Sequence, residues 1–206
     1  DDFAFLTKKN IFLYNFTELA SDRPLHYLFV ELQNFIIGDN AFYGFIFNIL
    51  SNLLLLIVIY NFFTIFFKSI STIILILTLY NLFLTKVEIY HYPIYGYLIL
   101  ANTLYLLSLI FFIKSFEKKF YFHIIISISI YFIAIFFYEA GFFLPIVLVF
   151  YTLIFKIDFF KKYLNIYFIF FIIALFYFIY RETNAFGLSQ VNPSRLANFN
   201  GFISSL

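Results

Sequence analysis

The chain has 206 residues, of which 64% are hydrophobic and 12% are charged, and its mean hydropathy is +0.97. A soluble domain needs more polar surface than this, so the composition predicts an all-α, polytopic membrane protein. Such a protein is embedded in a lipid bilayer, which is therefore an expected partner. The net charge of +2 is too small to indicate a nucleic-acid partner, and the absence of cysteine excludes a disulfide framework, a zinc ribbon and a thiol nucleophile.

Two further features of composition bear on how the chain is interpreted. Aromatic residues make up 26% of it, with 36 Phe, 18 Tyr and no Trp, which is typical of AT-biased coding and indicates no function. The chain contains no methionine and opens on a charged pair without a signal peptide. We therefore expect an internal or processed piece of a longer protein, with at least one membrane segment upstream and further chain downstream.

The first segment, residues 1–40, is predicted to be a water-facing loop that carries a short interfacial helix. The turn Ser21–Pro24 indicates a helix start, because Ser and Asp side chains cap free backbone N–H groups and proline suits a first helical turn. The helix is expected over about Pro24–Ile37, where about 14 residues are too few to span a bilayer. Polar residues interrupt its apolar face, which favours a position at the membrane surface. These residues are His26, Glu31, Gln33 and Asn34.

Residues 41–180 are predicted to form a transmembrane helical bundle of about six spans, since a span needs roughly 20 apolar residues. The expected spans are Ala41–Phe67, Ser69 to about Leu84, about Ile94–Ile113, about Phe120–Tyr138, a fifth that ends at Phe155 with Pro145 in its first turn, and a sixth that ends near Tyr180. Residues 181–206 are predicted to be a polar segment. Small and amide residues share one face of the first span and favour helix packing over ligand binding. They are Gly44, Asn48, Ser51 and Asn52.

The distribution of Lys and Arg between successive turns predicts the orientation of the chain. One set of very short turns is dense in lysine: Lys68, Lys114, Lys118, Lys119, Lys156, Lys161 and Lys162. The opposite set of basic residues is spread over longer segments: Lys8, Lys9, Arg23, Lys86, Arg181 and Arg195. The positive-inside rule places the dense turns in the cytoplasm, so residues 1–40, the Glu88 loop, Glu139 and residues 181–206 are expected on the outer face.

Candidate chemistry gathers on that outer face. No Asp, Glu, Lys, Arg or His falls in the middle of a predicted span, which argues against an ion-coupled carrier. No Ser-His-Asp order, Gly-rich phosphate loop or HExxH motif is present. The candidates that remain are Asp1, Asp2, Arg23, His26, Glu88, His91 and Glu139.

Two of these positions allow more than one interpretation. Glu139 lies in an otherwise apolar turn, and is either a helix-end carboxylate that caps the next helix or a partly desolvated carboxylate that positions a substrate hydroxyl or a cation such as Arg23. Glu88 and His91 could share a helical face, but two residues do not make a metal site, so solvation of their loop is favoured and no metal ligand is predicted.

Two stretches carry a resemblance to a known family. The stretch DDFAFL…DRPLHYLFVELQNFIIGDNAFYGFIFNIL resembles the first outer loop and second span of the GT-C superfamily. These enzymes are integral-membrane glycosyltransferases that use polyprenyl-phosphate sugars, and they include protein O-mannosyltransferase-like and aminoarabinose-transferase-like groups. The stretch FYEAGFFLPIVLVFY is similar to a turn that often reads K-E before a Leu-Pro helix, with Tyr138 here in place of the basic residue. The resemblance covers 1–68 and 131–155.

The resemblance implies transfer of a sugar from a polyprenyl-phosphate donor to a glycan, lipid or protein acceptor on the outer face of a bacterial inner membrane. It implies that Asp1 or Asp2 is the general base and that Arg23 steadies the phosphate, with His26, Glu88, His91 and Glu139 near the substrate. It implies no cofactor other than the donor and leaves a divalent metal open.

Two alternatives stay open beside the transferase. The first is a non-catalytic polytopic protein, such as a flippase for lipid-linked saccharides or an assembly subunit. The second is an O-antigen polymerase or ligase, which typically relies on a large outer loop rich in Arg and His that this chain does not show.

Overall fold

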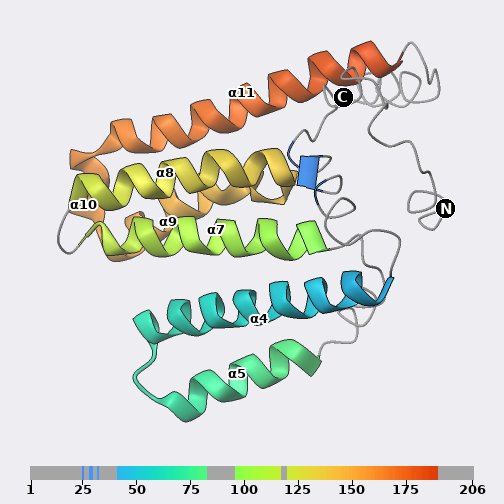
Figure 1. The fold of residues 1–206 in the computed structure, drawn as a ribbon. Helices are drawn as coiled ribbons and strands as arrows, with labels where there is room; N and C mark the ends of the chain where they lie inside the picture. The colour runs from blue at the N-terminus through green and yellow to red at the C-terminus, as the bar shows by residue number, and fades with distance from the viewer. Residues whose placement is uncertain are drawn as a thin grey trace, which may run out of the picture.

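The computed structural model describes residues 41–82, 96–116 and 120–189, together with Leu25, Leu28, Phe29 and Leu32. The described residues form helices joined by short turns and include no strand, which confirms the all-α prediction. The elements are α4 (Ala41–Phe66), α5 (Ile70–Leu82), α7 (Gly96–Lys114), α8 (Phe120–Phe137), the 3₁₀ helix η3 (Glu139–Phe143), α9 (Leu144–Phe155), α10 (Ile157–Lys162) and α11 (Leu164–Ser189). Figure 1 shows them running back and forth side by side.

Four of the helices are long and apolar enough to cross a membrane. Their apolar stretches are Phe42–Phe66, Gly96–Lys114, Phe120–Phe137 and Leu164–Arg181. At 1.5 Å per residue, even the shortest of these spans about 27 Å, which is close to the thickness of a hydrocarbon core. The predicted helical membrane bundle is therefore confirmed.

The structure differs from the prediction in the length of three helices. α5 has 13 residues and α9 has 12, so as described both are shorter than a bilayer-spanning helix. α9 is short because the η3 turn precedes it and Lys156 ends it. α11 continues to Ser189, although the sequence predicted a polar tail from Arg181 onward.

The main core lies among α7, α8, α9 and α11, which Figure 1 shows grouped together. Phe112 of α7 is fully buried in it and contacts two rings of α11, with centroids 5.9 Å away for Tyr167 and 6.0 Å for Phe170. α7 and α8 are also joined by side-chain hydrogen bonds. The Ser108 hydroxyl donates to the Ser127 carbonyl over 2.9 Å, and the Ser127 hydroxyl donates to the Ser108 carbonyl over 2.7 Å. Such reciprocal bonds fix the register of two helices where no charge is present.

The α4–α5 hairpin packs beside α7 through the polar face predicted for the first span. Gly44, Asn48 and Ser51 are buried, so their predicted role in packing is confirmed. The approach is close at the start of α7, because a Cβ atom added to Gly96 would lie 2.7 Å from Asn48 Oδ1. A small residue is therefore needed at Gly96 for α7 to reach α4.

Candidate functional site

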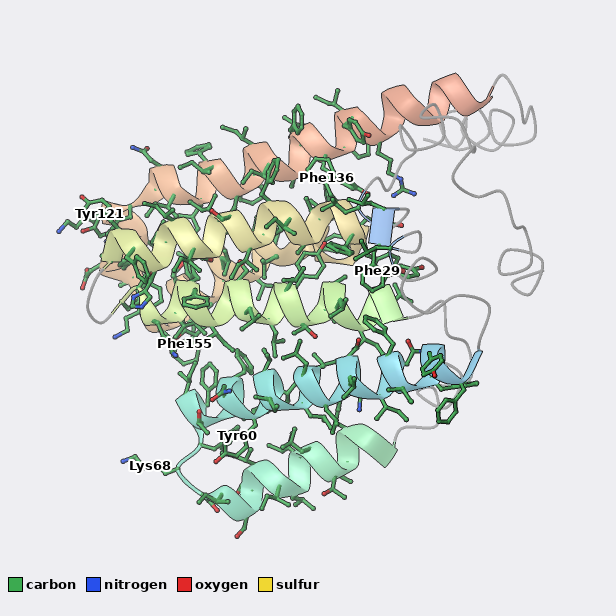
Figure 2. The ribbon with its side chains drawn as sticks, viewed as in Figure 1. Phe29, Tyr60, Lys68, Tyr121, Phe136 and Phe155 are labelled. Atoms are coloured by element: carbon green, nitrogen blue, oxygen red, sulfur yellow. The ribbon has the colours of Figure 1, made fainter. Side chains whose placement is uncertain are left out.

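The two ends of the bundle carry different charges. Because successive helices alternate in direction, one end holds Lys68, Lys114 and the lysines of α10, while Glu139 and Arg181 lie at the other end. Figure 2 shows Lys68 and Tyr121 at the first of these ends. The separation that the sequence predicted for the described charges is therefore present, and we refer to the two ends as the lysine end and the Glu139 end.

Among the described residues, the Glu139 end carries an ion pair between the η3 helix and α11. Glu139 Oε1 lies 3.5 Å from Arg181 Nη1, with 25% of the glutamate side chain and 35% of the arginine side chain exposed. Glu139 follows the apolar stretch of α8, and Arg181 closes the apolar stretch of α11. The pair therefore lies where two apolar stretches end.

Among the described residues, Arg181 is a cation beside Glu139. The suggested partner Arg23 lies outside the described residues, so that pairing stays a prediction. The next helix, α9, has Phe143 at its N-cap position and no side-chain hydrogen bond there. Glu139 therefore joins α11 to the turn between α8 and α9.

Tyr105, in the middle of α7, contacts the turn between α8 and α9. The Tyr105 hydroxyl donates a hydrogen bond to the Tyr138 carbonyl. A Cβ atom added to Gly141 would overlap the Tyr105 ring, so only glycine lets the turn lie against it. The backbone around Glu139 is thus positioned by a hydrogen bond and by a close contact, both from a helix far away in the sequence.

A second tyrosine, Tyr131, packs beside Tyr105 in the interior. Tyr131 is fully buried, its ring lies 6.3 Å from that of Tyr105, and its hydroxyl has no hydrogen-bond partner among the described residues. A buried hydroxyl of this kind costs about 1–3 kcal/mol when it stays unsatisfied. The Tyr131 hydroxyl beside Tyr105 could therefore take part in a further hydrogen bond.

Phe29, from the predicted interfacial helix, lies at the same end. The four described residues of that segment, Leu25, Leu28, Phe29 and Leu32, are all helical. The Phe29 ring lies 5.4 Å from that of Phe47 in α4 and 5.8 Å from that of Phe137 in α8 (Figure 2). Because Phe137 closely precedes Glu139, Phe29 and the ion pair share one end of the bundle.

Most of the site residues predicted from sequence lie outside the described residues. They are Asp1, Asp2, Arg23, His26, Glu88 and His91. Glu139 is the one member of the predicted set that the structure describes. Among the described residues, no group of three or more His, Cys, Asp and Glu is placed to hold a metal ion.

Sequence reasoning missed three residues of this end. Arg181 is the first charge after the sixth apolar stretch, and that position could have nominated it as a partner for a carboxylate at the same end. Gly141 is a small residue among bulky neighbours in a turn, which hints at a close approach. Tyr105 gave no signal, because tyrosine is common throughout these spans.

Comparisons with protein-family models, curated proteins and solved structures found no match for this chain.

Proposed function

We propose that the chain is part of an integral-membrane glycosyltransferase of the GT-C type. It moves a sugar from a polyprenyl-phosphate donor to a glycan, lipid or protein acceptor on the outer face of a bacterial inner membrane. The observation that carries this proposal is the Glu139–Arg181 pair where two apolar stretches end, with Phe29 packed on Phe137, two positions before Glu139. A guanidinium at headgroup depth suits a lipid-linked phosphate, because it can donate two parallel hydrogen bonds to the phosphate oxygens.

The reaction requires a base for the acceptor and a cation for the leaving group. The acceptor hydroxyl gives its proton to a carboxylate, its oxygen bonds to the anomeric carbon, and the bond from that carbon to the phosphate oxygen breaks. The electron pair of that bond leaves with polyprenyl phosphate. We assign the base to Asp1 or Asp2, on the resemblance of the opening stretch to the first outer loop of GT-C enzymes.

The cation has one candidate in the described structure and one outside it. Arg181 lies at the Glu139 end and is oriented by Glu139, so it supports a role in stabilising the charge that develops on the leaving phosphate. Arg23 is the second candidate, and His26, Glu88 and His91 are proposed to contact substrate from the same face.

The orientation of the bundle is part of the proposal. The positive-inside rule assigns the lysine end to the cytoplasm, because lysine is dense there in short turns. Residues 1–40, the Glu139–Arg181 pair and residues 181–206 are then extracytoplasmic, where a lipid-linked sugar donor presents its headgroup after translocation.

The test is donor turnover by the protein in proteoliposomes. Polyprenyl-phosphate sugars are offered one at a time, and release of free polyprenyl phosphate is measured for the wild type and for the double variant Asp1→Asn/Asp2→Asn. We expect release by the wild type and none by the double variant, with membrane insertion unchanged. Undiminished release by the double variant would remove the base assignment.

A second readout separates the transferase from the non-catalytic alternative. The same proteoliposomes are assayed for movement of the saccharide lipid from one leaflet to the other. Movement without turnover of any donor would contradict the transferase and support a flippase, whereas turnover confined to one leaflet supports the transferase.

A further inference from the structure

We propose a second interaction surface at the lysine end, which binds the headgroups of anionic phospholipids. We call it the α10 platform and define it by four lysines of α7 and α10 and of the turn before α10: Lys114, Lys156, Lys161 and Lys162. It is independent of the proposed transferase activity, which is placed at the opposite end of the bundle.

The platform has a rigid aromatic base. Phe159 of α10 packs its ring 4.3 Å from that of Phe116, 5.5 Å from that of Phe120 and 4.7 Å from that of Tyr163. Phe116 lies two residues after the end of α7, and Phe120 begins α8. These contacts fix α10 against the ends of both helices, so its lysines are held together with Lys114 instead of moving as a free loop.

The platform is strongly unbalanced in charge. Its four lysines are exposed, and none makes an ion pair with a described residue. Asp158 is the acidic residue of α10. The Lys162 ammonium lies 5.1 Å from the centre of the Tyr163 ring, so its stem follows an aromatic surface while the charge stays available. Among the described residues of this surface, the lysines therefore outnumber the carboxylates, and the complementary ligand is an anion.

The neighbouring apolar side chains identify a lipid as the source of that anion. Phe155 and Ile157 flank Lys156 in the chain and are 60% and 50% exposed, and Tyr121 at the same end is 76% exposed (Figure 2). A lipid satisfies both parts of this surface, because its phosphate meets the lysines while its acyl chains cover the apolar side chains. A soluble polyanion would leave Phe155 and Ile157 in water.

The absence of tryptophan makes a direct test possible. The substitution Ile157→Trp introduces a single tryptophan beside the lysines, which is excited selectively over the 18 tyrosines. The protein is reconstituted in bilayers in which either phosphatidylglycerol or phosphatidylcholine carries brominated, quenching acyl chains. We expect the anionic lipid to be enriched at the platform by roughly fivefold, the effect of about one basic residue near a charged membrane surface. Equal quenching by the two lipids would overturn the proposal.

Matched variants locate the effect. The triple change Lys156→Gln/Lys161→Gln/Lys162→Gln should abolish the enrichment, and Asp158→Asn should increase it. Lys68→Gln removes a lysine from the α4–α5 turn at the same end of the bundle. This change should leave the enrichment of the anionic lipid unchanged. An enrichment that survives the triple change, or that is lost equally with Lys68→Gln, would contradict an α10 site.

Two measurements on the reporter protein with its lysines intact keep the test independent of variant folding. Raising the salt to about 1 M, where the Debye length falls to about 3 Å, should remove the enrichment. Soluble glycerol phosphate or an acidic peptide should not displace the brominated lipid at matched phosphate or carboxylate concentration. Displacement by either, or persistence of the enrichment at high salt, would show that the surface is not built for an anionic lipid.

Discussion

The lysine end and the Glu139 end of the bundle differ in how their charged side chains are held. At the lysine end, exposed lysines stand on packed aromatic rings and make no ion pair with the described protein. At the Glu139 end, the two charges face each other, and Tyr105 and Gly141 fix the turn beneath them. We therefore expect that removing a lysine charge from the lysine end leaves the structure intact. At the Glu139 end, we expect substitutions to disturb the contacts of Tyr105 and Gly141 with the turn.

The largest expected effect concerns the orientation of the two ends, which should lie on opposite sides of a membrane. Labelling of a cysteine from one side should then be complete at one end and absent at the other. The chain has no cysteine, so single cysteines report unambiguously. Phe42→Cys, at a position 64% exposed near the start of α4, should react with a membrane-impermeant maleimide on intact cells. Asp158→Cys in α10 should react only after permeabilisation. Labelling of both from the same side, or the reverse pattern, would break the comparison and the proposed orientation.

The largest stability effect should come from the turn at the Glu139 end. Gly141→Ala forces a Cβ atom into the Tyr105 ring, and overpacking of this kind costs about 1–3 kcal/mol. Lys156→Ala, at the other end of α9, should change the free energy of unfolding by less than about 0.5 kcal/mol, as exposed sites usually do. Unfolding in mixed micelles measures both, and equal losses would show that the two ends are equally constrained.

A smaller effect should follow from removing one hydroxyl. Tyr105→Phe loses the hydrogen bond to the Tyr138 carbonyl and should lower the free energy of unfolding by about 1 kcal/mol. Tyr121→Phe removes an exposed hydroxyl at the lysine end and serves as the control, with no measurable change expected. A Tyr105→Phe variant as stable as this control would mean that the hydrogen bond does not hold the turn.

The smallest effect should arise midway between the two ends. Ser108→Ala removes a donor from the paired serines of α7 and α8, and interhelical hydrogen bonds in membranes average about 0.6 kcal/mol. Ser71→Ala, on an exposed face of α5, is the control. If Ser108→Ala destabilised the protein more than Gly141→Ala does, the midspan contact and not the Glu139 turn would be the main constraint.

The sequence predicted those parts of the fold that depend on local composition. Apolar runs between lysines located the long helices, and the small polar face of the first span correctly indicated packing against another helix. α10 was predicted only as a turn, because IDFFKK is too short to show a helical period and its helix depends on Phe159 packing into the aromatic cluster. The length of α11 was underestimated because its polar residues after Arg181 resemble a tail.

The candidate site could be predicted only in part. Glu139 stood out as a lone carboxylate in an apolar turn, but its partner is 42 positions away in the sequence and becomes visible only when α11 packs beside α8. The contact between Gly141 and Tyr105 likewise depends on tertiary structure, since it joins the α8–α9 turn to the middle of α7. Asp1, Asp2, Arg23, His26, Glu88 and His91 stay predictions, because they lie outside the described residues.

One measurement tests most directly whether the Glu139 end is the functional end. Donor turnover in proteoliposomes is compared for Arg181→Gln and Lys114→Gln, each of which removes a single cation, but from opposite ends of the bundle. The account predicts that Arg181→Gln slows release of polyprenyl phosphate by about 100-fold, the usual cost of losing one group that stabilises developing charge. Lys114→Gln should stay within about twofold of the wild type, because the proposed reacting groups are assigned to the opposite end of the bundle. Equal rates for the two variants, or a larger loss for Lys114→Gln, would contradict it.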